Sequence, residues 1–368
     1  DLTCIETLDP DYATENWTNA NGNIDEEVTF SVICGSEEQD VWHVATTGSD
    51  GGAGTQESPF ATVQMGINAA SDGNTVHVAA GTYVENINFS GKNIAVLGEN
   101  RETTIIDGGG VSNVVRFEND ENMDAVLSGF TLTNGRGVEG YVYGRGGGIC
   151  NRASPTLSDL TIIGNTALGG GGGMYIGSTS SSIITDVDII NNITEAWRGG
   201  GIYYFGGNAT LSNMKIIGNQ AANGGGIGFQ NVTDIEMDHI VISGNTASTG
   251  AGILLNGGNF EFGHLTIVGN VSSNGSSGGI TFSDSYNYNS ELLLSNSIVY
   301  DNSGDQQIIF GPNSDPHAIT VAYSNIQSAE DAILTNDNGT VTWGDGNLDS
   351  DPLFCEADSG NYHIAGNS

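Results

Sequence analysis

Hydrophobic and polar positions recur along most of this chain with a nearly constant period. A run of glycines ends on an apolar residue six times, at spacings of 25, 28, 25, 26 and 27 residues. These apolar residues are Ile149, Met174, Ile202, Ile227, Ile253 and Ile280. Each repeat also contains a short apolar stretch that ends on an asparagine, and these asparagines are Asn165, Asn192, Asn219, Asn245, Asn270 and Asn302. Two columns of residues with one period predict a solenoid.

Within each repeat, apolar and polar residues alternate in short stretches such as LSDLTII, which are rich in β-branched residues. Such alternation is typical of strands, and the glycines and asparagines mark turns that need a positive φ. The pattern therefore predicts an all-β fold, a parallel β-helix with one coil per repeat and coils about 4.8 Å apart. Asparagines stacked in register would form a hydrogen-bonded ladder along one turn.

The regularity of the pattern divides the chain into segments. Regular coils span residues 136–302, irregular coils precede them over 76–135, and a closing segment follows over 303–368. Residues 41–75 are the predicted entry to the solenoid. Residues 1–40 do not fit the repeat, and we expect a separate small cap or interaction arm there.

The entry segment contains the stretch SPFATVQMGINAASDG, in which Phe60, Val63 and Ile67 have helical spacing. This spacing predicts an amphipathic helix that covers the first coil, because the open end of a solenoid must be capped. In the N-terminal segment, Cys4 and Cys34 bracket a short loop and could form a disulfide. Such a bond would favour an oxidising, extracellular location.

Three stretches resemble a known family. SPFATVQMGINAASDGNTVHVAAGTYVENINF followed by KNIAVLGE resembles the entry of the pectin-lyase-like, right-handed parallel β-helix superfamily. The GGGI…N coils are similar to the repeats of secreted bacterial β-helix surface proteins. YSNIQ…GDGNLDSDPLF…GNYHI resembles the segment that often precedes a sorting or anchoring domain in those proteins. The resemblance implies a right-handed, single-stranded β-helix at a bacterial cell surface, but no particular activity, because the superfamily includes lyases, hydrolases, esterases, adhesins and fibres.

The charge balance narrows the range of partners. The 368 residues include 44 Asp and Glu but only 8 Lys and Arg, which gives a formal net charge of −36. Such a surface would repel nucleic acid, and we expect no nucleic-acid partner. The sequence contains no apolar run of the length that spans a membrane. A secreted, extracellular protein is the expectation.

Catalytic motifs of the superfamily are missing. The paired-Asp motifs of pectin methylesterases and the Gly-His-Gly of polygalacturonases do not occur. Pectate-type lyases commonly use an arginine or lysine base beside calcium, and the two lysines, Lys92 and Lys215, stand in strand-like contexts. A lysine base is therefore not expected.

Arginines and aromatic residues gather between residues 136 and 198. An arginine can bind the acid group of a glycan while a ring stacks on its sugar face. The candidate ligand-binding residues are Arg136, Arg145, Arg152, Trp197, Arg198 and Tyr203. If the protein is an enzyme, the candidate catalytic residues are Arg145, Arg198, Tyr141 and Tyr143. The alternative is structural: the arginines neutralise an acidic wall and the aromatic residues pack an insertion at 137–145.

Two groups could bind metal, although no cofactor is expected to be required. Asp345, Asp349 and Asp351 form a loop cluster of carboxylates that could hold Ca²⁺. His239 and His264 both stand six positions before a ladder asparagine, so coil stacking would bring them to about 5 Å. They could form a metal pair, or they could belong to a polar ladder at a turn, bonded to their neighbours.

An outward column of isoleucines points to self-association. Ile163, Ile190 and Ile217 stand two positions before the ladder asparagines, and alternation directs them away from the core. Together these features predict a secreted, non-catalytic structural or adhesive protein at the cell surface, whose partners are further copies of itself or surface glycans. The alternatives are a polysaccharide lyase on acidic glycans and a glycan-binding module.

Overall fold

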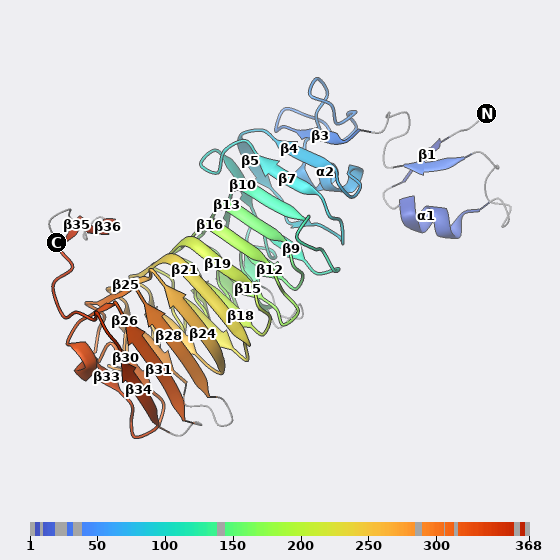
Figure 1. The fold of residues 1–368 in the computed structure, drawn as a ribbon. Coiled ribbons are helices and arrows are strands. Elements are labelled where there is room, and N and C mark those ends of the chain that lie inside the picture. Colours follow the sequence, from blue (N-terminus) through green and yellow to red (C-terminus); the bar gives the residue numbers. More distant parts are fainter. Residues whose placement is uncertain are drawn as a thin grey trace.

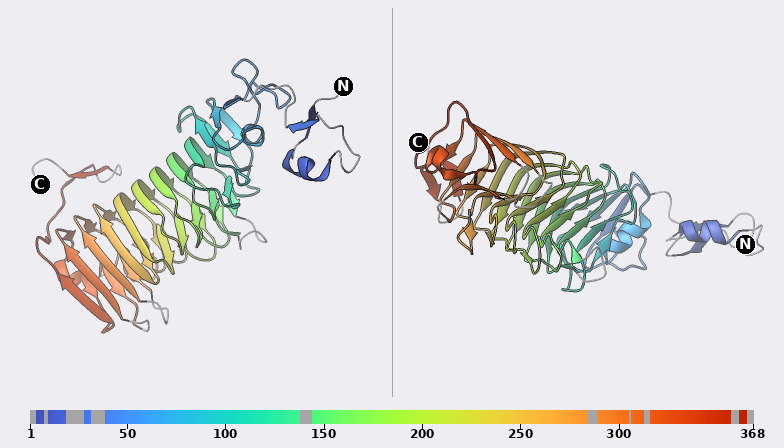
Figure 2. Two further views of the ribbon diagram at one scale, coloured as in Figure 1. Left: turned by 45° about the vertical axis from the view of Figure 1, so that its right-hand side comes forward. Right: turned by 90° about the horizontal axis from the view of Figure 1, so that it is seen from below.

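The chain forms a long solenoid of stacked coils, shown in Figures 1 and 2 as a computed structural model. The structure describes residues 4–7, 10–18, 28–31, 39–137, 144–283, 289–304, 306–312, 316–356 and 361–364. Strands of successive coils pair in parallel along the solenoid, and apolar side chains of all coils form one core. The predicted all-β parallel β-helix is confirmed.

One wall of the solenoid is a ten-stranded parallel sheet of short strands, which we call the short-strand sheet. Its strands are β6 (Ile87–Asn88), β9 (Val115–Phe117), β12 (Ile149–Asn151), β15 (Met174–Ile176), β18 (Ile202–Phe205), β20 (Ile227–Gln230), β23 (Ile253–Leu255), β27 (Ile280–Phe282), β30 (Ile308–Phe310) and β33 (Ile333–Leu334). The apolar residues that end the glycine runs pair in register from Ile149 to Ile280. Sheet pairing therefore aligns the column that the sequence revealed.

A second parallel sheet, which we call the long-strand sheet, contains the longest strands of the solenoid together with several short ones. In the first coils these are β3 (Val41–Val44), β4 (Thr75–Val78), β5 (Gly81–Val84), β7 (Ala95–Gly98), β8 (Thr104–Asp107), β10 (Val126–Thr133), β13 (Thr156–Ile163), β16 (Ile183–Ile190), β19 (Thr210–Ile217) and β21 (Asp234–Ser243). Beyond β21 they are β24 (Gly258–Gly263), β25 (Thr266–Val268), β28 (Ser290–Ser295), β29 (Ile298–Tyr300), β31 (His317–Ala322), β32 (Asn325–Ile326) and β34 (Gly339–Trp343). Very short strands form a third wall: β11 (Arg136–Gly137), β14 (Thr166–Ala167), β17 (Ile193–Thr194), β22 (Thr246–Ala247) and β26 (Val271–Ser272).

Six successive coils of the long-strand sheet each bend at one non-glycine residue with a left-handed backbone. These bend residues are Asp159, Asp186, Asn213, His239, His264 and Asn296, with φ between 48° and 56°. Aspartate, asparagine and histidine adopt this conformation more readily than other side chains. In β19 the bend lets Leu211 and Met214 both point inward although they are three residues apart. These six bend residues stand six positions before the ladder asparagines and form one column along the sheet. We call this column the line of bends.

The predicted asparagine ladder is present and buried. The side-chain oxygen of each asparagine accepts hydrogen bonds from the backbone and side-chain N–H groups of the preceding one, from Asn165 through Asn302. The six side chains are at most 5% exposed. The glycine turns that follow need a positive φ, for example 69° at Gly199, which costs glycine little.

The ends of the solenoid differ from its middle. Helix α2 (Val63–Ala69) buries Val63 and Ile67 as predicted, and it begins at Thr62, whose side chain caps the Met65 amide. At the far end, 3₁₀ helix η3 (Ala329–Ala332) precedes β33. Strands β35 (Phe354–Glu356) and β36 (Asn361–Ile364) form an antiparallel pair.

The N-terminal segment lies beyond the first coils (Figure 1). In it, β1 (Cys4–Glu6) pairs in parallel with β2 (Thr29–Ser31), and helix α1 (Pro10–Asn16) lies between them in sequence. Cys34 is outside the described residues, so its disulfide with Cys4 stays a prediction. Cys150 and Cys355 have free thiols. Within the described part of the chain, no helix is long and apolar enough to cross a membrane.

Candidate functional site

Three of the predicted ligand-binding residues, Arg145, Arg198 and Tyr203, meet on the outer face of the short-strand sheet. Parallel pairing of β12, β15 and β18 stacks Cys150, Tyr175 and Tyr203 in register. The guanidinium carbon of Arg145 lies 5.0 Å from the ring centre of Tyr175, 5.3 Å from that of Tyr203 and 5.4 Å from that of Phe205. Its Nη1 also donates a hydrogen bond of 3.0 Å to the Tyr175 hydroxyl.

Arg198 joins the same group from the coil that carries Tyr203, two coils beyond that of Arg145. Its Nη1 donates to Gln230 Oε1 at 3.0 Å, and the Tyr203 hydroxyl donates to the same oxygen at 2.7 Å. Gly228 makes room for this contact, because a Cβ there would lie 3.1 Å from the Cβ of Arg198. We call the six side chains the Arg145 cluster: Arg145, Tyr175, Arg198, Tyr203, Phe205 and Gln230.

Burial determines the chemistry of the Arg145 cluster. Tyr203 is fully buried and Tyr175 is 4% exposed, whereas Arg145 is half-buried. Burial raises the pKa of both phenols, and the positive charge of Arg145 only partly offsets this. Both tyrosines therefore stay protonated at neutral pH, and neither can act as a base. Because its ring is covered, Tyr203 cannot stack on a sugar as the sequence suggested.

The other predicted residues take no part in the contacts given above for this cluster. Arg136 is exposed and forms a 3.8 Å ion pair with Glu195, while Arg152 and Trp197 are exposed. Tyr141 and Tyr143 are outside the described residues. Lys92 is committed to the fold, since its Nζ donates to three backbone carbonyls at the end of α2, of Ile67, Asn68 and Ala70, at 2.7–3.0 Å.

A second region lies on the outer face of the long-strand sheet. Outward residues of β21, β24, β28 and β31 form a shallow groove of about 300 Å³. Its charged lining is entirely acidic, and consists of Asp234, Glu236, Glu261 and Glu291. Glu236 and Glu261 are direct neighbours in register. The groove is therefore a site for neutral or cationic groups rather than for polyanions.

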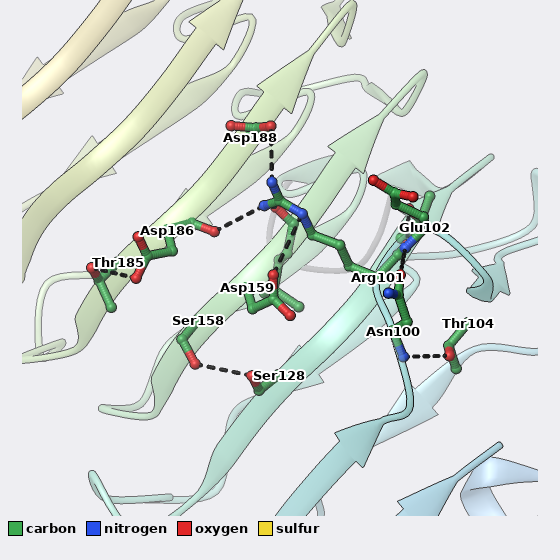
Figure 3. A network of polar contacts seen from close by, with 12 residues as sticks. Asn100, Arg101, Glu102, Thr104, Ser128, Ser158, Asp159, Thr185, Asp186 and Asp188 are labelled. Carbon is green, nitrogen blue, oxygen red and sulfur yellow. Dashed lines mark hydrogen bonds and ion pairs between the residues drawn. The ribbon is translucent and has the colours of Figure 1, made fainter. Parts of the chain in front are cut away.

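The line of bends carries charge contacts that the sequence analysis missed. Arg101, from the loop between β7 and β8, crosses the bends of β13 and β16 (Figure 3). Its Nε lies 3.4 Å from Asp159 Oδ1 and its Nη2 lies 3.5 Å from Asp188 Oδ2. Its Nη1 donates to the backbone oxygens of Leu160 and Asp186. Two aspartates at successive bend positions were the available sequence signal, but nothing indicated that a residue some 60 positions upstream would reach them.

Further along the line of bends, His239 and His264 stack as their spacing predicted. Their ring centres are 4.5 Å apart and their planes differ by 18°. Asp238 lies against both rings: its Oδ2 is 2.6 Å from His239 Nδ1, and its Oδ1 is 2.8 Å from His264 Nδ1. All three residues are exposed. Both imidazoles are therefore hydrogen-bonded to a neighbouring side chain. This agrees with the alternative prediction that the two histidines belong to a polar ladder at a turn.

The carboxylates of Asp345, Asp349 and Asp351 do not converge, contrary to the predicted calcium site. Among the described residues, Asp238, His239 and His264 make up the one group of three or more potential ligands within metal-binding distance of one another. Asp349 instead accepts a hydrogen bond from the Ser328 amide, and Asp351 accepts one from the Leu353 amide. These aspartates stabilise loop turns, a common role for this residue type.

The isoleucine column points outward, but it is not fully exposed. Ile163, Ile190 and Ile217 pair in register on β13, β16 and β19, and each is half-buried. Their mutual stacking removes part of each side chain from solvent, which alternation alone does not predict. The column remains an apolar ridge beside a column of polar outward residues.

Comparisons with known proteins agree with this geometry. A family model described as "Right handed beta helix region" matches residues 147–349. The solved structure of pectate lyase Pel9A is similar over 90% of both chains, with 15% identity and a TM-score of 0.53. A pectin methylesterase from carrot is similar over 82% of this chain and 88% of its own, with 15% identity and a TM-score of 0.39. The search of curated proteins gave no match. At such identities, the similarity to the pectate lyase concerns the fold alone.

Proposed function

The chain belongs to the right-handed β-helix family, within the pectin-lyase-like superfamily that its sequence resembles, and from this premise we propose that it is a secreted, non-catalytic scaffold at a cell surface. The solenoid is a rigid wall that displays side chains at a fixed spacing. Its role is adhesive or structural, and its partners are surface glycans or further copies of the same chain.

The observation that carries this proposal is that the side chains of the Arg145 cluster pack against and hydrogen-bond to one another. A lyase needs a base that can reach the proton it removes. Arg145 instead lies against three aromatic rings and donates to Tyr175, while burial keeps the Tyr175 and Tyr203 phenols protonated. These side chains hold adjacent coils together.

The acidic groove supports the same conclusion. Without a bridging divalent cation, its carboxylates, among them Glu236 and Glu261, would repel pectate or any other polyanionic chain. A substrate of this kind would need either cationic side chains, which the lining does not contain, or divalent cations that bridge its acid groups to the carboxylates of the groove. The groove suits a neutral glycan or a cationic partner.

The apolar ridge supports self-association as one form of the scaffold. Ile163, Ile190 and Ile217 keep partly exposed faces on a wall where the neighbouring outward column is polar. Burying this ridge against a second copy would remove apolar surface from water. The lateral contact would join solenoids side by side.

Sedimentation velocity and electron microscopy of the purified full chain test this proposal. We expect association that increases with concentration, or retention on cell surfaces. Ile190→Glu should weaken lateral association, whereas Thr210→Glu, at an exposed position of the neighbouring strand, should not. Circular dichroism of both variants checks that they fold. A strictly monomeric protein that binds neither cells nor glycans would contradict the proposal.

The two alternatives from the sequence make different predictions. A lyase would release unsaturated product from acidic polysaccharides, and a glycan-binding module would bind on a glycan array without turnover. Trp197 precedes Arg198 in the chain and is 54% exposed, so among the described residues of the predicted region it is the exposed aromatic platform for a sugar. Glycan binding that Trp197→Ala abolishes would favour the module.

A further inference from the structure

We propose that Asp238, His239 and His264 form a binding site for a divalent transition-metal ion, with Zn²⁺ as the expected occupant. The inference rests on the geometry of the line of bends and does not depend on the proposed scaffold role.

Two consecutive coils supply the ligands. His239 is the bend residue of β21, and His264 holds the same place in the next coil, between β24 and β25. Stacking of the coils therefore brings the rings to a centre-to-centre distance of 4.5 Å. Asp238 directly precedes the first bend, and its carboxylate reaches both rings. One ligand atom from each residue lies within 4.8 Å of the other two.

A glycine provides the space for this arrangement. Asp238 faces outward, and its register partner in the next coil is Gly263. A Cβ on Gly263 would lie 3.2 Å from Asp238 Oδ1, tighter than an ordinary van der Waals contact. The absence of that Cβ lets the carboxylate lie toward His264 and bind both histidines at once.

The donor set and its dimensions suit zinc. Imidazole nitrogen and carboxylate oxygen both bind Zn²⁺ at about 2.0–2.2 Å, so two ligand atoms on a tetrahedral ion lie about 3.3 Å apart. The present separations of 2.6 Å and 2.8 Å are shorter, and side-chain rotations of exposed groups can open them. Imidazole ligands favour zinc and similar transition metals over Ca²⁺. Three protein ligands leave a coordination position open to solvent.

Neighbouring charge favours a cation at this place. Glu236 stands two residues before Asp238 on the same outward face of β21. Glu261 is the register partner of Glu236 in the next coil. Both carboxylates line the acidic groove. The negative field of this face raises the local concentration of divalent cations.

A second histidine pair in the same chain provides a control. His43 and His77 pair in register on β3 and β4 and also stack, with ring centres 5.8 Å apart. In the described part of the chain, this pair belongs to no group of three potential ligands within metal-binding distance. The two pairs therefore differ in the carboxylate that lies between the rings.

Isothermal titration of the untagged full chain with Zn²⁺, after treatment with a chelator, tests the proposal. The ligand variants are taken from neighbouring coils, so that each bend is preserved. His239→Asn and His264→Asn place at these bends the residue that Asn213 and Asn296 already provide. Asp238→Ser places there the residue type of Ser212, its register partner. His77→Gln is the control.

We expect one Zn²⁺ site per chain, weakened at least about tenfold by each ligand variant, because losing even an outer-shell partner of a metal site costs about 10–100-fold. His77→Gln should leave the affinity unchanged. Co²⁺ bound to the same site should show a visible absorption band that the ligand variants lose. If wild type binds Zn²⁺ no more tightly than the His239→Asn/His264→Asn double variant, the cluster is only a hydrogen-bonded pair and the proposal fails.

Discussion

Replacing Asn219 with alanine is the sharpest test of how the coils are held together. Asn219 is fully buried and makes four side-chain hydrogen bonds to neighbouring coils. Its Oδ1 accepts from the backbone and side-chain nitrogens of Asn192, at 2.9 Å and 3.1 Å. Its Nδ2 donates to the backbone oxygen of Ile189 at 2.9 Å and to Asn245 Oδ1 at 3.0 Å.

The free-energy cost follows from these contacts. A hydrogen bond contributes about 1 kcal/mol net, and a buried donor left without a partner costs about 1–3 kcal/mol. Asn219→Ala removes four bonds and leaves the backbone N–H of Asn192 without the acceptor it has in the ladder. Four bonds at about 1 kcal/mol each and about 1–3 kcal/mol for the unpaired N–H together predict that the free energy of unfolding falls by about 5–7 kcal/mol.

Urea unfolding followed by circular dichroism measures this change, and hydrogen exchange locates it. Exchange of the Asn192 amide should accelerate most, because that amide loses its acceptor. Asn208→Ala is the control: Asn208 is exposed and accepts one hydrogen bond, from Ser181, so we expect a change within about 0.5–1 kcal/mol. If Asn219→Ala costs no more than Asn208→Ala, the ladder does not stabilise the coils and the reasoning is refuted.

Three further predictions follow from single contacts. Arg145→Ala should destabilise the protein by about 1–3 kcal/mol through lost ring contacts and the Tyr175 hydrogen bond, whereas Arg136→Ala, which breaks an exposed ion pair, should cost under about 1 kcal/mol; thermal unfolding distinguishes them. Gly199→Ala should lower the free energy of unfolding by at least about 2 kcal/mol more than Gly269→Ala. Both glycines have a positive φ, which costs an alanine about 1–2 kcal/mol. Only at Gly199 would the added Cβ also collide with the Ile202 carbonyl. Peptide mapping after alkylation at pH 8 should show Cys355 modified and Cys150 protected, because burial raises the pKa of Cys150 to about 12; modification of Cys150 at the rate of Cys355 in the folded protein would contradict its burial.

The parts of the fold that depend on register could be predicted from the sequence. Aligning the repeats by their glycine runs placed the ladder asparagines and the stacked pair His239 and His264 correctly, because parallel pairing without register shifts carries sequence columns directly into space. Alternation likewise directed Ile190 outward. Each of these inferences needed only the period of the repeat and the direction of a side chain from its strand.

The predictions that failed depend on which outward faces are covered. Tyr203 points away from the core, yet it is fully buried, because Arg145 and Phe205 pack on it. The column position itself does not reveal this cover. Arg101 reaches Asp188 from 87 residues away in the sequence, a contact set by a loop rather than by the repeat. Asp349 was a candidate calcium ligand, but its cluster does not converge and its carboxylate accepts a hydrogen bond from the Ser328 amide.

The central claim is that the Arg145 cluster stabilises the wall and performs no catalysis. Incubating the purified full chain with pectate, alginate and sulfated glycans, with and without Ca²⁺, and following the ultraviolet absorbance of unsaturated product tests it directly. We predict no product above that of heat-unfolded protein. Product release by wild type that Arg145→Ala or Arg198→Ala abolishes, while the variants remain folded, would contradict the account.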